Sequence, residues 1–187
     1  EGAADFLMLL PNDTELLNFD LGALCSRVSK FSNLAAIIPL MRNSPYTHIL
    51  PSDRVGLAWS VPEGPIILSR EFILNQKRCG VDVFDNLNFR GYLSFTDLAL
   101  KIYANNFCML VSDLVSYSEN ETYLQTQFQL IGTEPIEQNL KLLLTEGKIW
   151  LAKKYGVQDG RSLELIVRLL FEAFLESNPE YATYAIR

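Results

Sequence analysis

The chain has 187 residues, of which 49% are hydrophobic and only 20% are charged, and this composition excludes intrinsic disorder over most of its length. No apolar run approaches the roughly 20 residues that a membrane-spanning helix needs, so we expect no membrane span. The net charge is −6, and basic residues cluster only in short pairs such as Lys77-Arg78. Binding to duplex nucleic acid is therefore not expected, because it needs many clustered basic side chains.

The cysteines indicate the redox state of the compartment in which the protein works. Cys25, Cys79 and Cys108 lie far apart without CxxC spacing, and an odd count with no pairing framework suits a reducing environment. We therefore expect an intracellular protein, either cytoplasmic or nuclear. Because the sequence starts at Glu1 and stops directly after YATYAI, we expect residues 1–187 to be a single globular domain excised from a longer protein, although processing would produce the same start.

The first quarter of the chain is predicted to be helical. The segment NDTE supplies capping residues before an apolar run whose spacing suits one or two helices between Thr14 and Phe31. A shorter helix is predicted over 33–42, where Pro39 must kink or end it. Residues 43–54 contain two prolines and several turn-forming residues, and we expect them to form a loop.

The spacing of apolar residues then changes to the two-residue repeat of a strand. In VGLAWSV (55–61) alternate residues share one face, as in a half-buried strand. After PEGP, the segment IILSREFIL (66–74) predicts the second arm of an antiparallel β-hairpin near 55–74, or alternatively a helix that Ser69 caps. Residues 75–93 are rich in loop-forming residues and include a candidate short strand at VDVF.

The second half of the chain returns to helices. The segment SFTD (94–97) resembles a capping box with Asp in place of Glu, and it predicts a long helix that ends near Tyr117. In YLQTQFQLI (123–131) apolar residues alternate with glutamines, which predicts a second strand. A further helix is predicted from Pro135 to Tyr155, where Gly156 ends it.

The last predicted helix, RSLELIVRLLFEAFLES (161–177), is apolar around most of its circumference. Its charged residues Glu164, Arg168, Glu172 and Glu176 are each four residues apart, so they form one narrow ribbon. An ordinary surface helix has an apolar arc of about 100° or a little more. This helix is therefore either wrapped by the rest of the domain or used as an interface with another molecule.

These patterns predict an α+β fold with about five helices and a small antiparallel sheet that includes the hairpin. We expect the last helix to form an interface, either with a second copy of the chain or with another protein. The candidate contacts are Val167, Leu170, Phe171 and Phe174 on the helix, with Trp59 and Trp150 as aromatic anchors.

Motifs for catalysis and ligand binding are missing from the sequence. His48 is the only histidine, which excludes zinc sites built from two or more histidines, and no G-x-S-x-G elbow or P-loop is present. We therefore expect no catalytic residue, no metal site and no cofactor. The loop NFRGY (88–92) offers Arg90 and Tyr92 as candidate contacts for an anion, unless Arg90 pairs with a local acid such as Asp85.

The sequence thus favours a non-enzymatic assembly or adaptor domain that acts through a hydrophobic helical surface. Two alternatives stay open. The chain could be a small hydrolase or transferase with a site between the 55–74 hairpin and the 75–93 loop, using His48, Cys79 or Asp85. It could instead be a regulatory domain that binds an apolar ligand.

Overall fold

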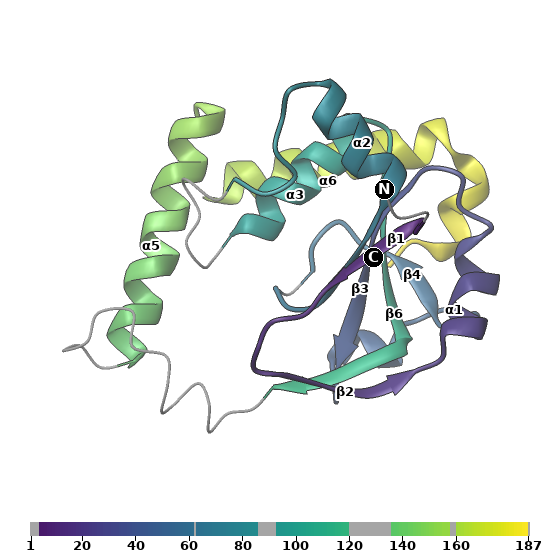
Figure 1. Ribbon diagram of the computed structural model, residues 1–187. Coiled ribbons are helices and arrows are strands. Elements are labelled where there is room, and N and C mark those ends of the chain that lie inside the picture. Colours follow the sequence, from purple (N-terminus) through teal and green to yellow (C-terminus); the bar gives the residue numbers. More distant parts are fainter. Residues whose placement is uncertain (1–3, 62, 86–92, 120–135, 158–159, 187) are drawn as a thin grey trace.

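The computed structural model describes residues 4–61, 63–85, 93–119, 136–157 and 160–186 (Figure 1). The strand predicted over 123–131 and the candidate anion contacts Arg90 and Tyr92 lie outside these ranges. None of the helices within the described ranges is long and apolar enough to cross a membrane.

Six strands of the described ranges form one mixed sheet. They are β1 (Phe6–Leu9), β2 (Thr14–Phe19), β3 (Leu34–Met41), β4 (Val55–Leu57), β5 (Ile66–Ser69) and β6 (Cys108–Glu119). The strand order is β1-β5-β3-β6-β2, and β4 pairs with the N-terminal half of β6 on the same side as β2. Only β3 and β6 are parallel, and the other pairings are antiparallel.

Helices cover this sheet. They are α1 (Leu21–Val28), α2 (Arg70–Arg78), α3 (Ser94–Ala104), α5 (Ile136–Tyr155) and α6 (Gly160–Ser177), with short 3-10 helices η1 (Pro45–His48) and η2 (Pro179–Tyr184). In Figure 1, α2, α3 and α6 lie together above the sheet, α5 stands to their left and α1 lies at the right-hand side. After η2 the chain returns to the sheet, where the N–H of Ile186 donates to the carbonyl of Leu57 at 2.8 Å.

The predicted small antiparallel sheet with a hairpin near 55–74 is wrong. The sheet is large and mixed, and β4 and β5 do not pair with each other. Instead β4 pairs with β6, and β5 lies between β1 and β3. The alternative for the second arm is confirmed, because the Ser69 hydroxyl accepts a hydrogen bond from the N–H of Phe72 at 3.2 Å and caps α2.

The helix predicted over 33–42 is also wrong, because this segment is the central strand β3. Seven of its eight residues are buried, so both faces of the strand are covered. A strand buried on both faces shows a continuous apolar run instead of an alternating pattern, and periodicity cannot distinguish it from a buried helix. Pro39 is accommodated where the register with β6 shifts.

Two other predicted helices are shorter than expected. Between Thr14 and Phe31 the chain first forms β2, and only then α1, which Asp20 caps by accepting from the N–H of Ala23 at 3.0 Å. The helix predicted from 94 to about 117 ends at Ala104, and β6 follows. Asn106 sits between them with φ 56°, a left-handed conformation that asparagine tolerates and that stops a helix. The short strand expected at VDVF does not form.

The sheet curls because its two edge strands are consecutive in the chain. Only residues 10–13 separate β1 from β2, and the N–H of Thr14 bonds to the carbonyl of Pro11 at 3.2 Å in a turn. A link that contains this turn spans at most about 14 Å. In a flat sheet, strands four positions apart would lie roughly 19 Å from each other. The sheet therefore bends into a half-barrel whose edges approach one another.

The last helix, α6, divides its apolar residues between the core and the surface. Its inward face consists of buried side chains: Leu163, Val167, Phe171, Phe174 and Leu175. Its outward flank consists of exposed ones: Leu165, Ile166 and Leu169. The Phe171 ring lies edge-on to Tyr103 of α3, with the ring centroids 5.3 Å apart. The predicted contacts Val167, Phe171 and Phe174 therefore lie inside the core of this chain, and Leu170 is partly buried.

A buried carboxylate joins α3 to α5. Asp97 is fully buried, and its carboxylate pairs with Lys101 at 2.6 Å and with Lys154 at 2.8 Å. The Tyr155 hydroxyl donates to the same carboxylate at 2.7 Å, and burial together with this bond raises the pKa of Tyr155. Lys154 also pairs with Asp85 at 2.9 Å, which ties the segment before α3 into the network.

Replacing Phe171 with Asp should lower the free energy of unfolding by more than about 4 kcal/mol, because it puts a charge into the core between α6 and α3. The matched control is Leu169→Asp on the outward flank, which should change stability by no more than about 0.5 kcal/mol. Urea unfolding of both variants measures the difference. Equal losses would contradict the division of α6 into two faces.

Asp97→Ala should lower the free energy of unfolding by about 3–5 kcal/mol, because it leaves the ammonium groups of Lys101 and Lys154 without their buried partner. Asp53 is the control, since its bonds to Lys30 and Arg27 lie at the surface. Asp53→Ala should cost much less than Asp97→Ala, because water screens exposed ion pairs. Thermal and urea unfolding report both values, and a neutral Asp97→Ala would refute the structural role of the network.

Candidate functional site

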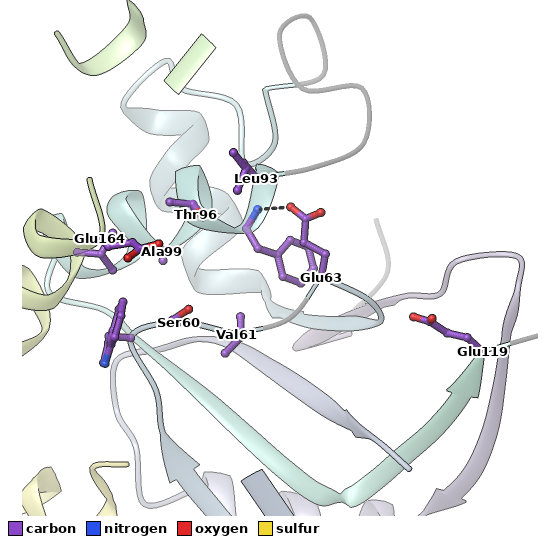
Figure 2. Close-up of a pocket in the computed structure, with 11 residues that line it drawn as sticks. Ser60, Val61, Glu63, Leu93, Thr96, Ala99, Glu119 and Glu164 are labelled. Carbon is purple, nitrogen blue, oxygen red and sulfur yellow. Dashed lines mark hydrogen bonds between the residues drawn. The ribbon is translucent and has the colours of Figure 1, made fainter. Parts of the chain in front are cut away.

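A cleft of about 430 Å³ opens between the connection from β4 to β5, the start of α3, and α6 (Figure 2). Two of the predicted interface residues, Trp59 and Val167, line it. Its charged lining residues are the three carboxylates Glu63, Glu119 and Glu164. The cleft is therefore acidic with an aromatic wall.

Glu63 has a structural partner in this cleft. Leu93 precedes α3 in a left-handed conformation (φ 69°) and makes no side-chain cap. Instead the Glu63 carboxylate accepts from the N–H of Phe95 at 3.3 Å and from the Ser94 hydroxyl at 3.2 Å. The predicted Ser94 capping box is thus wrong, because Ser94 is the first residue of the helix and Glu63 caps it from outside. Burial raises the pKa of Glu63, against the lowering effect of these bonds.

The three carboxylates of the cleft do not form one cluster. Figure 2 shows the three carboxylates on separate walls, with Glu63 beside α3, Glu119 at the end of β6 and Glu164 near Ala99. Within the described ranges no group of three or more His, Cys, Asp or Glu residues could hold a metal ion. The Glu63 carboxylate accepts from the Ser94 hydroxyl and from the N–H of Phe95 at the first turn of α3, so helix capping accounts for its position.

The residues named for a hydrolase or transferase come from separate elements. His48 ends η1 and is exposed, Cys79 follows α2 and is exposed, and Asp85 pairs with Lys154 at 2.9 Å. None of the three lines the acidic cleft. The predicted anchor Trp150 lies on α5, where it is partly buried and the Lys153 ammonium lies 4.7 Å from its ring centroid.

Exposed apolar residues are concentrated in the N-terminal segment instead. Eight large side chains between residues 6 and 21 are exposed by 37% to 53%. We call them the N-terminal apolar surface: Phe6, Leu7, Leu9, Leu10, Leu16, Leu17, Phe19 and Leu21. Single exposed apolar residues are ordinary, whereas eight within 16 residues are typical of a site of interaction.

An apolar cavity of about 160 Å³ connects the two edges of the sheet beneath this surface. We call it the edge cavity. Its lining residues come from β1, β2 and α1 and from the strands β3 and β5: Phe6, Met8, Phe19, Leu21, Leu24, Cys25, Val28, Ile37 and Ile67. An apolar cavity of about 150 Å³ holds one benzene ring, and pockets for larger ligands start at about 300 Å³. The edge cavity therefore fits one aromatic or branched side chain.

The edge cavity continues into a wider groove of about 640 Å³ between α1 and the start of α2. The two spaces share Phe6, Cys25 and Val28 in their linings. The groove also carries polar and charged groups, among them Asp5, Arg70 and Glu71. Together they form an elongated depression that starts at an apolar end and becomes polar.

Sequence reasoning missed this site for a specific reason. The helical spacing assigned to 14–31 placed its leucines in a helix, and the run FLMLL before it received no role. A short apolar run next to a proline turn, followed by a second run, is a signal for two strands and would have pointed to it.

The raised pKa of Glu63 predicts a pH dependence of stability. Because its pKa in the folded state lies above the ordinary value of 4.5, its contribution to stability is complete below pH 4.5 and is lost as the pH rises through the raised pKa. Between pH 4.5 and the raised pKa of Glu63, the native chain should lose stability relative to the Glu63→Gln variant. Glutamine keeps an oxygen acceptor but does not titrate. Urea unfolding of both proteins across the interval measures the difference, and parallel curves would exclude the effect.

Comparison of the chain with protein-family models, with curated proteins and with solved structures finds no match. Its function must therefore be inferred from its own surface, where the N-terminal segment holds eight of the large apolar side chains that are exposed among the described residues.

Proposed function

We propose that the chain is a protein-binding domain whose N-terminal apolar surface binds another protein. The observation that supports this most directly is the exposure of eight large apolar side chains around two edge strands. Leaving such a group in water forgoes about 25 cal/mol for each Å² of apolar area, which a partner would recover. Interfaces use apolar and aromatic residues of this kind as their central contacts.

The position of the surface on strand edges supports a protein partner over a small ligand. The cavity beneath it is large enough for one ring only, so most of the exposed side chains lie outside it. A small apolar ligand would leave them in water. A protein surface can cover both the cavity and the side chains around it.

Charge favours a different protein over a second copy. Residues 4–21 carry four acids, Asp5, Asp13, Glu15 and Asp20, and no lysine or arginine. Two copies that met through this surface would bring their acids together, and such like-charge contacts are costly. A partner with basic residues beside its apolar side chains meets the opposite charge, and this complementarity also speeds association.

This proposal replaces the helical surface as the main contact region. The inward residues of α6 are occupied by the core, whereas its outward flank offers only Leu165, Ile166 and Leu169. The flank is smaller and lacks an adjoining cavity among those described. It serves as an internal control, because it is apolar and exposed but belongs to another element.

A photo-crosslinking amino acid placed at Leu7 or Leu16, in cells that make the full-length protein, should attach to one defined protein that mass spectrometry can identify. The same group at Leu169 should not capture that protein. Leu7→Lys combined with Leu16→Lys should weaken the isolated complex at least about tenfold, because it removes apolar contact and repels a basic partner. Capture at neither strand position, or capture of a second copy of this chain, would refute the proposal.

A further inference from the structure

Among the described residues, the first strand has backbone groups that pair with no other strand. The carbonyl of Asp5 accepts from the N–H of Arg70 at 2.8 Å, and the register pairs Leu7 with Leu68 and Leu9 with Ile66. In an antiparallel pair, hydrogen-bonded and non-bonded positions alternate. The bonds to β5 therefore come from residues 5, 7 and 9, and the N–H and C=O groups of Phe6 and Met8 point away from β5, toward the open edge.

The same two residues line the edge cavity. Phe6 and Met8 contribute one wall and Phe19 of β2 contributes another, so the open edge of β1 borders the cavity. Side chains of one strand alternate between the faces of a sheet. A strand added beside β1 would thus place every second side chain on the side of the cavity, where there is room for one ring.

The surroundings determine what such a strand would carry. The apolar lining selects an aromatic or branched side chain, and the wider groove that starts at Phe6 and Cys25 gives the chain a path onward between α1 and α2. Along this path Asp5 and Glu71 outnumber Arg70. Charge complementarity therefore favours basic residues next to the apolar anchor.

We infer that the partner binds as an extended segment that adds a strand to the open edge of β1 and inserts one aromatic or branched side chain into the edge cavity, with basic residues beside it. This inference rests on the proposed function and specifies its mode. Strand addition obtains affinity from main-chain hydrogen bonds and specificity from pockets for alternate side chains, and β1 offers both. A helical partner would leave the outward N–H and C=O groups of Phe6 and Met8 unpaired.

The test uses displayed random linear peptides of about 12 residues, selected against the whole chain and measured by fluorescence anisotropy. Enriched peptides should share one aromatic or leucine residue flanked by Lys or Arg. N-methylation of alternate backbone positions in the peptide tests for strand addition without altering the protein. One set of alternate positions should lose at least about tenfold in affinity and the other set should bind unchanged, because only every second N–H faces β1.

Variants of the chain test the same contacts from the other side. Met8→Pro removes an N–H that β5 does not use, and it should weaken the peptide at least about tenfold, whereas Met8→Leu should not. Cys25→Trp fills the edge cavity and should have a similar effect. Bound peptide should protect Cys25 from iodoacetamide while Cys79, which is also exposed and lies outside the cavity, reacts at an unchanged rate.

The outcomes separate this inference from the proposed function. If no peptide is enriched, or if both N-methylated sets bind equally, strand addition is refuted. If crosslinks from Leu7 still capture a protein in that case, the binding function stands and only its mode is wrong. A dimer in light scattering that Cys25→Trp abolishes would assign the edge to a second copy, and would overturn the choice of partner.

Discussion

Four residues, 10–13, join strands that lie at opposite edges of one sheet, and the rest of the structure depends on this short connection. It cannot reach across a flat sheet of this width, so the sheet must curl. The curl brings β1, β2 and α1 around a common interior and places Phe6 and Phe19, from the two edges, in one lining. It does not close the barrel, because within the described ranges β1 and β2 pair with β5 and β6 but not with each other. The open edges and the cavity between them are thus direct consequences of the chain connectivity.

The two sides of the sheet differ in how completely the chain covers them. On one side α3 is the central element: its Tyr103 packs against Phe171 of α6, and its Asp97 binds the lysine and tyrosine that end α5. Aromatic packing and a buried ion network both converge on this helix, so the helical layer is fixed by contacts within the chain. On the other side, the helix among the described residues is α1, which has eight residues. Two aromatic residues of the last helix, Phe171 and Phe174, pack against Tyr103 of α3, while its outward flank stays exposed. A larger group of exposed apolar side chains lies at the N-terminal strands.

Long helices with clear ends could be predicted from the sequence, and the strands mostly could not. The helix that ends before Gly156 is confirmed, because a glycine with φ 66° stops it by a local rule. The sequence predicts a helix at the central strand β3, because burial on both faces removes the alternation that marks a strand. Its neighbours β5 and β6 come from distant parts of the chain, and no local pattern encodes such pairings. The candidate site was missed for the same reason: it exists only where β1, β2 and α1 meet. The position of Asp97 suggests a helix cap, whereas its carboxylate binds Lys101 on α3 and Lys154 and Tyr155 on α5.

The two open edges are not equally protected against pairing. Natural proteins guard edge strands with charged residues, prolines and bulges. The β2 edge has such features, with Glu15 and Asn18 on the strand and a register shift between Leu16 and Asn18. The β1 edge has none of them within its four residues, FLML. An unprotected apolar edge is a template for aggregation unless something covers it. If a partner binds this edge as proposed, its occupancy and the solubility of the protein are coupled, because the same backbone groups would serve both the partner and non-specific association.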